Sequence, residues 1–161
     1  MDPFTLRFTE LIRKHERIIF SVCFFYATPA VPFEDLRQEV LISLFRSYPR
    51  FRNESRESTW VYRVCLNTCL FSLKRFSPRI ETVPLDSVVS LSDEISPADK
   101  EKLDWLYERI GRLGPVDKAI VLMWLDDLSY VEIASNLGIP RNTVASKLHR
   151  IKEKISSQTD V

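Results

Sequence analysis

Residues 128–155 read LSYVEIASNLGIPRNTVASKLHRIKEKI, a pattern typical of two short helices joined by a tight turn. Gly138 suits the left-handed backbone position that ends the first helix, and Pro140 suits the first turn of the second. Apolar residues recur at helical spacing in both segments. We expect the buried residues to be Val131, Ile133, Ala134 and Leu137 in the first helix and Val144, Leu148, Ile151 and Ile155 in the second. The pattern predicts a helix-turn-helix.

The outward face of the second helix carries small polar groups and one arginine. Stepping along the helix from Val144 places on this face Asn142, Ala145, Ser146, His149 and Arg150. The flanking cations are Lys147, Lys152 and Lys154. In a major groove an arginine can pair with a guanine edge while lysines hold phosphates. The pattern favours a DNA-reading helix, and the alternative is an amphipathic helix with a solvated basic face.

The composition favours an all-α protein. The chain has 161 residues, of which 45% are hydrophobic and only three are glycine. This length suits one ordinary domain or two small ones. No apolar run is long enough to span a membrane and no signal-peptide pattern begins the chain, so we expect a cytoplasmic protein. Cys23, Cys65 and Cys69 are expected to be buried thiols, with no metal site and no other cofactor.

The net charge of +1 does not by itself suggest nucleic acid, but the distribution of charge does. Basic residues dominate between Arg46 and Arg79, and acidic residues dominate between Leu91 and Glu108. Basic residues return in the second helix of the helix-turn-helix. Two basic zones separated by an acidic stretch can bind one polyanion at two places.

Helical patterns fall into two groups. We expect helices near Thr5–Ala27, Phe33–Ser47, Ser58–Arg75, Pro97–Leu113, Val116–Asp127, Tyr130–Leu137 and Arg141–Ser156. The segment between the groups is rich in Ser, Pro, Asp and Val and has no steady period, which is typical of a linker. The predicted organisation is an N-terminal domain over residues 1–76, a flexible linker over 77–96 and a C-terminal domain over 97–161.

Residues 33–45 read FEDLRQEVLISLF and predict a helix that buries Leu36, Val40 and Leu44. Its other face carries Asp35, Gln38, Glu39 and Ile42. An acidic and amide surface is poorly suited to DNA, so this face needs solvent or a protein partner. Composition alone favours solvent.

A basic loop with aromatic residues follows that helix. Residues 48–59 read YPRFRNESREST, and residues 60–68 read WVYRVCLNT. Arginines interleaved with aromatic rings suit single-stranded nucleic acid, where phosphates are followed and bases stack. Trp60 fits a core position at least equally well. Trp105 and Trp124 lie within apolar helical stretches and are expected in the core.

Six motifs together resemble a known family. They are residues 34–40 (EDLRQEV), 51–55 (FRNES), 59–64 (TWVYRV), 66–68 (LNT), 129–134 (SYVEIA) and 143–150 (TVASKLHR). Their order and spacing resemble those of small bacterial RNA polymerase sigma factors of the extracytoplasmic-function (ECF) group. The similarity extends over nearly the whole chain except the linker and the extreme ends.

The resemblance implies roles for residues of the N-terminal half. The helix that carries Asp35, Gln38 and Glu39 matches the one that docks on the coiled coil of the polymerase clamp, so this face becomes a partner surface. The loop from Asn53 to Ser58 matches the one that receives a base flipped from the −10 element of the promoter. The residues expected at the −10 element are Asn53, Ser55, Arg56, Ser58, Trp60, Arg63 and Asn67, with Trp60 bracing the helix.

The resemblance also implies roles for the C-terminal half. Ser146, His149 and Arg150 match positions that read the −35 element, and Thr143 and Lys147 match phosphate contacts. Arg141 and Asn142 complete the expected −35 set. The acidic pair Asp93 and Glu94 in the linker would mimic nucleic acid inside the polymerase. Ala145 departs from the basic residue common in the family, so the promoter sequence cannot be transferred from a relative.

These features predict a sigma subunit that binds core RNA polymerase, recognises promoter DNA and assists strand opening. No nucleophile–base pair or phosphate-binding glycine loop is visible, so no enzymatic activity is expected. The resemblance adds an anti-sigma factor as an expected partner. One alternative is a stand-alone helix-turn-helix regulator with an N-terminal interaction domain, which would bind duplex DNA by itself. Another is a helical adaptor whose basic faces are only solvated.

Overall fold

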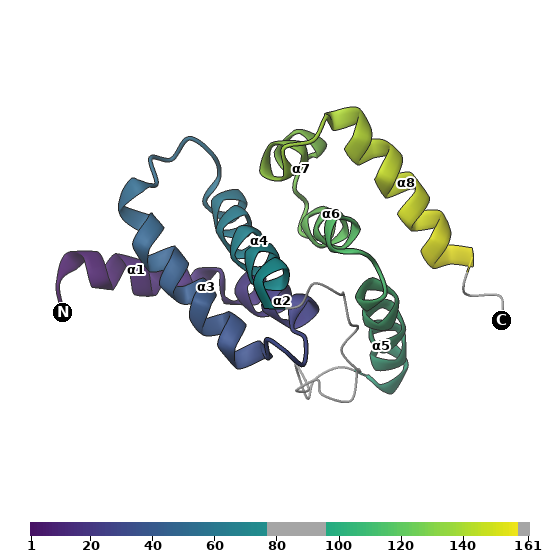
Figure 1. Cartoon of the computed structure of the whole chain (residues 1–161), viewed down its shortest axis with the longest axis horizontal. Coiled ribbons are helices and arrows are strands. Elements are labelled where there is room, and N and C mark those ends of the chain that lie inside the picture. The colour runs from purple at the N-terminus through teal and green to yellow at the C-terminus, as the bar shows by residue number, and fades with distance from the viewer. Residues whose placement is uncertain (77–95, 158–161) are drawn as a thin grey trace.

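A computed structural model describes residues 1–76 and 96–157 (Figure 1). All regular structure within these two ranges is helical, which confirms the all-α prediction. The helices form an N-terminal and a C-terminal group that lie against each other. The linker predicted at 77–96, with Asp93 and Glu94, falls outside the described residues except for Ser96, which caps the following helix.

The N-terminal group contains α1 (Pro3–Lys14), α2 (Glu16–Tyr26), α3 (Phe33–Ser47), the short 3-10 helix η1 (Tyr48–Arg50) and α4 (Glu57–Phe76). The prediction of one continuous helix over Thr5–Ala27 was wrong, because the chain turns at His15 between α1 and α2. The buried His15 ring lies 2.7 Å from a carboxylate oxygen of Glu57 at the start of α4. This contact holds the turn against α4.

Helices α2, α3 and α4 enclose the N-terminal core. The completely buried side chains include Val22, Cys23, Val40, Leu44, Val61 and Cys65. Leu36 is also buried, so the predicted inner face of α3 is confirmed. Cys69 joins the core, and all three thiols are free, as expected. Burial raises the pKa of Cys65 well above its usual value, because a thiolate would lose its hydration there.

The C-terminal group contains α5 (Pro97–Gly111), α6 (Pro115–Leu125), α7 (Tyr130–Leu137) and α8 (Arg141–Ser157). Gly138, with φ of 66°, ends α7 in the predicted left-handed conformation. Pro140 lies just before α8, and its carbonyl accepts from the amides of Thr143 and Val144. Helices α7 and α8 therefore form the predicted helix-turn-helix.

The predicted inner faces of α7 and α8 are correct except at one position. Ile133, Ala134, Val144, Leu148 and Ile151 are buried, and Leu137 and Ile155 pack against the core. Val131 was expected to be buried but is 62% exposed. Helix α7 has only eight residues, and the face that packs on α6 and α8 is used by Ile133 and Ala134.

Helix α6 lies at the centre of the molecule because it contacts α7 and α8 on one side and α2 and α4 on the other. Residues 118–123 are all buried, as expected for a helix covered on every side. The Lys118 ammonium donates to the carbonyl of Phe25 at 2.9 Å. Burial lowers the pKa of Lys118 to about 8, because the charged form loses its hydration.

Hydrogen bonds from α2 and α4 also reach α6. The Tyr26 hydroxyl donates to the carbonyl of Pro115 at 2.5 Å, and the Tyr62 hydroxyl donates to the carbonyl of Leu122 at 3.2 Å. The Tyr62 hydroxyl also contacts the carboxylate of Asp126, which in turn pairs with Arg17 of α2. The two groups of helices thus form a joint core and not two separate ones.

The tryptophans are distributed differently from the prediction. Trp60 is buried, with its ring stacked on Phe51 at a centroid distance of 4.8 Å. Trp124 is partly buried and packs against the core, as expected, whereas the expectation of a core position for Trp105 was wrong, because its ring is only partly buried and does not join that core. A cation covers the ring in each case, Arg109 over Trp105 at 4.2 Å and Lys152 over Trp124 at 4.3 Å.

We predict that Leu44→Ala lowers the free energy of unfolding by about 2–5 kcal/mol, because it leaves a cavity between α3 and its neighbours. The control is Ile42→Ala on the same helix, where the side chain is 47% exposed. It should change the free energy of unfolding by less than about 0.5 kcal/mol. Urea unfolding followed by circular dichroism measures both. Equal losses in the two variants would contradict the packing of α3.

Candidate nucleic-acid interface

Helix α8 lies on the side of the C-terminal group that is remote from the N-terminal helices (Figure 1). Asn142, Ser146, His149 and Arg150 are exposed on its polar face. The opposite stripe is buried against α6 and α7, so the helix is held firmly while this face stays free. The geometry is that of a helix anchored by its apolar side and available to a groove.

The flanks of this face are basic. Lys147, Arg150 and Lys154 line a shallow cavity together with Asp117 at the start of α6. The ammonium of Lys147 lies 3.8 Å from the carboxylate of Asp117, and both side chains remain partly exposed. Thr143 is half-buried and Arg141 is exposed, with its guanidinium 5.8 Å from the centre of the Tyr130 ring. A ring nitrogen of His149 lies 3.2 Å from the carboxylate of Glu153, and both side chains are exposed.

The loop before α4 forms a second polar region. Asn53 is exposed and has φ of 58°, a left-handed conformation that asparagine tolerates better than most residues. The loop borders a cavity of about 280 Å³ that is also lined by Phe4 and Arg7 of α1 and by Tyr48 of η1. The sequence did not predict that α1 borders this region, because the residues of α1 are distant from the loop in the chain.

The predicted −10 residues do not share one environment. Arg56 and Asn67 are exposed, whereas Ser55, Ser58 and Arg63 are half-buried. Trp60 is 9% exposed, so its ring supports α4 and Phe51 and has almost no surface to offer a base. The burial confirms the core position that the sequence allowed for Trp60.

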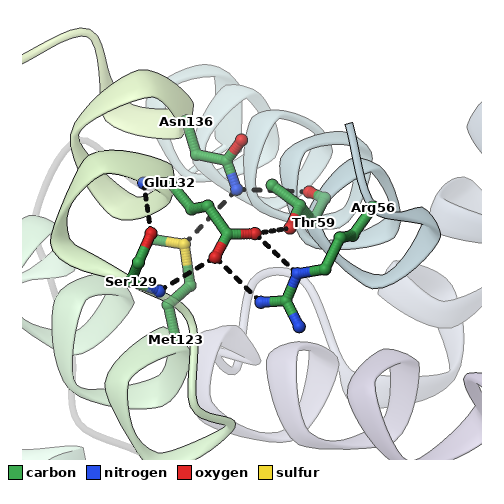
Figure 2. A network of polar contacts seen from close by, with 6 residues as sticks. All are labelled: Arg56, Thr59, Met123, Ser129, Glu132 and Asn136. Atoms are coloured by element: carbon green, nitrogen blue, oxygen red, sulfur yellow. Dashed lines mark hydrogen bonds and ion pairs between the residues drawn. The ribbon is translucent and has the colours of Figure 1, made fainter. Parts of the chain in front are cut away.

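Arg56 and Arg63 are engaged by α7, which the sequence did not predict. Both carboxylate oxygens of Glu132 accept hydrogen bonds from the Arg56 guanidinium, at 2.8 and 2.9 Å. The hydroxyl of Thr59 donates to the same carboxylate at 2.6 Å. Figure 2 shows the Glu132 side chain of α7 directed at Thr59 of α4 and at Arg56, the residue just before α4.

A second set of hydrogen bonds lies one turn further along α7 and about two turns beyond Arg56 on the α4 side. Arg63 donates to the amide oxygen of Asn136 at 3.1 Å and lies 3.5 Å from the hydroxyl of Ser135. The amide nitrogen of Asn136 donates to the carbonyl of Thr59 at 3.2 Å. The two sets together make a continuous polar seam between α4 and α7.

Glu132 also belongs to the capping box of α7. Its carboxylate accepts from the amide of Ser129 at 3.0 Å, and the Ser129 hydroxyl accepts from the amide of Glu132 at 3.1 Å. The spacing of a serine and a glutamate three residues later is visible in the sequence and marks the helix start. It gives no sign that the same carboxylate reaches α4.

These hydrogen bonds change the pKa of Glu132. The Arg56 guanidinium, with added hydrogen bonds from Thr59 and Ser129, lowers the pKa of Glu132 from 4.5 to about 2. The same pair raises the pKa of Arg56. The carboxylate is therefore charged throughout the ordinary pH range.

A third exposed surface lies on α3. Asp35, Gln38 and Glu39 are all exposed there, as predicted. Within the described part of the chain none of the three forms an ion pair. The apolar side chain of Ile42, predicted on the same face, is also exposed and lies one turn beyond Gln38. A mixed acidic and apolar patch suits contact with a basic protein surface.

The described residues show no group of three or more histidines, cysteines or carboxylates that could hold a metal ion. None of their helices is both long and apolar enough to cross a membrane.

Comparison with known proteins gives two family matches in the order of the two helical groups. Residues 11–77 match the model described as Sigma-70 region 2, and residues 103–155 match Sigma-70, region 4. The ECF RNA polymerase sigma-E factor of Escherichia coli (strain K12) is 30% identical over 164 residues, covering 94% of this chain and 85% of that protein. The chain belongs to the ECF sigma factors.

Other relatives agree with this family. The ECF RNA polymerase sigma factor SigW of Bacillus subtilis (strain 168) is 25% identical over 172 residues, covering 94% of this chain and 88% of its own. The sigma factor RpoE of Bartonella quintana, solved with the anti-sigma factor NepR, has a TM-score of 0.73 at 18% identity, with 96% and 98% of the two chains covered. CnrH, solved with the cytosolic domain of CnrY, has a TM-score of 0.64 at 16% identity, with 95% and 87% covered.

We predict that Arg56→Gln raises the pKa of Glu132 in this sigma factor by about one unit or more, because it removes the main cause of the lowered value. Since the folded-state pKa lies below the usual 4.5, the contribution of Glu132 to stability is complete above about pH 4.5 and is lost as the pH falls toward 2. Carboxyl carbon chemical shifts followed from pH 6 downward measure the midpoint. The same midpoint in the wild type and the variant would contradict the contact.

Proposed function

We propose that this ECF sigma factor binds core RNA polymerase, directs it to specific promoters and assists strand opening. The observation that carries the proposal is the presence of both sigma regions in one chain, each on a helical group with an exposed polar face. The proposed organisation is an N-terminal domain over residues 1–76, a linker over 77–96 and a C-terminal domain over 97–161. The protein itself performs no covalent chemistry, and it acts in the cytoplasm, where the polymerase transcribes.

In the C-terminal domain, α8 reads the −35 element in the major groove. Ser146, His149 and Arg150 contact base edges, since they lie at the centre of its exposed face. Thr143 and Lys147 contact phosphates. Arg141 and Asn142, at the start of α8, complete the set at the −35 element. The buried stripe of α8 keeps these side chains in a fixed register.

In the N-terminal domain, the loop from Asn53 to Ser58 and the adjoining face of α4 contact the −10 element. The cavity beside Asn53 has the aromatic lining and polar groups that a base removed from the stack requires. Arg56, Arg63 and Asn67 follow the strand along α4, and Trp60 supports the helix from inside. Binding an unstacked base offsets the few kcal/mol that opening a base-pair step costs.

Helix α3 is the proposed polymerase contact, through Asp35, Gln38 and Glu39. An exposed acidic face without ion-pair partners in the described residues is free to meet a cationic surface on another protein. We also propose an anti-sigma factor as a partner. The support is that RpoE of Bartonella quintana, which shares the fold, was solved with one.

The proposal is tested by transcription with purified core polymerase and genomic DNA fragments. Wild-type protein should be captured by the polymerase and direct starts at defined sites, and the Asp35→Arg, Glu39→Arg double variant should lose both. The matched control is Glu101→Arg, Asp104→Arg, which makes the same charge change at exposed positions of α5. Capture of the α3 variant at wild-type affinity would contradict the docking face. Starts that do not depend on adding the protein would contradict the function.

Arg150→Ala should cost roughly 1–3 kcal/mol of promoter binding by the holoenzyme, confined to one base position of the −35 element. Lys154→Ala is the comparison, because an exposed lysine at the edge of the face should hold a phosphate and weaken all sequences alike. Binding to a set of single-base promoter variants measures both. A uniform loss for Arg150→Ala would make it a phosphate contact.

A further inference from the structure

Phe71 of α4 carries an exposed aromatic ring. The residue is 64% exposed, more than any other aromatic residue in the described part of the chain. The next two residues, Ser72 and Leu73, are buried, so α4 is held on its inner side while Phe71 lies on the outer side. A single exposed apolar residue is ordinary on a protein surface, so its surroundings decide whether this one has a role.

Phe71 is also the exception among the phenylalanines. Every other phenylalanine whose side chain the structure describes lies next to a second aromatic ring, at centroid distances between 4.8 and 6.1 Å. Within the same residues Phe71 has no ring partner. Its ring is therefore available to an aromatic group from outside the chain.

The exposed residues next to Phe71 on α4 are polar or basic. Asn67 lies one turn before it, and Lys74 and Arg75 lie one turn after it. At 3.6 residues per turn, Asn67, Phe71 and Lys74 fall within an arc of about 60° on the helix. Residues 67–75 contain no carboxylate. The ring thus lies on a basic face that continues from Asn67, a residue that we assign to the −10 strand.

This arrangement suits single-stranded DNA better than a protein partner. The centre of a protein–protein interface is depleted of charged residues, whereas the face beside Phe71 is cationic. A groove for single-stranded nucleic acid combines positive charge with aromatic rings on which bases stack. In an intact duplex the faces of the bases are covered by their neighbours, so only an opened strand can offer a base to the ring.

The length of the face also suits a short piece of strand. Asn67 and Lys74 are seven residues apart, which is about 10 Å along a helix. Stacked nucleotides of one strand are about 3.4 Å apart, so this length corresponds to about three nucleotides. One base on Phe71 can therefore have a neighbour at Asn67 and a phosphate at Lys74.

We propose that Phe71 is a stacking platform for an unpaired base of the opened promoter strand, with Lys74 holding a phosphate beside it. The proposal rests on the proposed function of α4 and adds a residue to it. Every base has an aromatic face, so this contact holds the strand irrespective of its sequence. Phe71 therefore keeps the strand open, while base recognition is left to other residues.

The test compares Phe71→Ala, Phe71→Leu and Phe71→Trp in the full-length protein. Leucine keeps an apolar side chain but lacks an aromatic face, and tryptophan offers a larger aromatic face. The control is Val131→Ala, which shortens another apolar side chain, 62% exposed, on α7. Thermal unfolding by circular dichroism verifies that all the variants fold, as expected for substitutions at exposed positions.

The measured quantity is the dissociation constant for a fluorescein-labelled single-stranded DNA of about 12 nucleotides and random sequence, read by fluorescence anisotropy. Phe71→Ala and Phe71→Leu should each bind about 5-fold more weakly or worse, because stacking contributes about 1 kcal/mol or more per base. Phe71→Trp should bind at least as tightly as the wild type. Val131→Ala should stay within about twofold of it.

Two further measurements separate stacking from charge. A blunt-ended duplex of the same length has no unstacked base, so Phe71→Ala should bind it like the wild type. Phe71→Ala should also leave the salt dependence of single-strand binding unchanged, because it removes no charge. Lys74→Ala should lower the slope of log affinity against log salt by about 0.7, the value for one phosphate contact on a single strand.

Wild-type affinity of Phe71→Ala for the single strand would overturn the proposal. Wild-type affinity of Phe71→Leu would overturn it too, since it would show an apolar contact without stacking. An equal loss on the duplex would also contradict it. Unchanged strand binding with weaker capture by core polymerase in Phe71→Ala would assign the ring to a protein surface instead.

The transcription assay keeps these failures distinct from failure of the proposed function. Defined starts together with unchanged strand affinity in Phe71→Ala would remove the stacking platform and leave the sigma function. Weaker strand binding in Phe71→Ala without any polymerase-dependent start would leave the stacking platform and remove that function.

Discussion

The carboxylate of Glu132 connects the local structure of one half of the molecule to the surface of the other. One of its oxygens accepts from the Ser129 amide at the start of α7, and both face Arg56 across the gap to α4. A charge placed among these donors is stabilised in its ionised form, which the lowered pKa reflects. The position of α7, and with it the turn that leads to α8, is therefore coupled to Arg56 and to the start of α4.

Helix α6 supplies the apolar part of the same coupling. It is covered by α7 and α8 on one side and by α2 and α4 on the other, so separation of the groups exposes one of its faces. That face is not purely apolar. Lys118 and the carbonyls of Pro115 and Leu122 lie on it, each hydrogen-bonded to the N-terminal group. Water can replace these bonds when the groups separate, which makes the joint core easier to open than an entirely apolar one.

Features that lie within one helix could be predicted from the sequence. The buried stripe of α8, the exposed set Asp35, Gln38 and Glu39, and the left-handed Gly138 all follow from helical spacing or backbone preference. Val131 was mistaken because an eight-residue helix has too few apolar positions to define its inner face. Trp105 was mistaken because an apolar neighbourhood in the sequence does not reveal that the ring stays partly exposed beneath Arg109.

The contacts of the candidate site between distant segments could not be predicted in this way. Arg56 and Glu132 are 76 residues apart, and the sequence accounts for each separately, Arg56 as a residue expected at the −10 element and Glu132 as a capping residue. Only the packing of α6 between the two groups brings them together. The contact of Arg7 with the cavity beside Asn53 could not be predicted either, because Arg7 lies on α1, more than 40 residues earlier in the chain.

The most direct measurement of the central claim is the distance between the two helical groups in the free protein and in the promoter complex. Nitroxide labels at cysteines introduced for Glu10 on α1 and Glu101 on α5 would report it, since both positions are exposed and the three native thiols are buried. Pulsed electron resonance should give one defined distance in the free protein. It should give a distance longer by tens of ångströms when core polymerase and promoter DNA are bound. An identical distance in both states would show that the groups stay together and would contradict the proposed binding of two promoter elements by one chain.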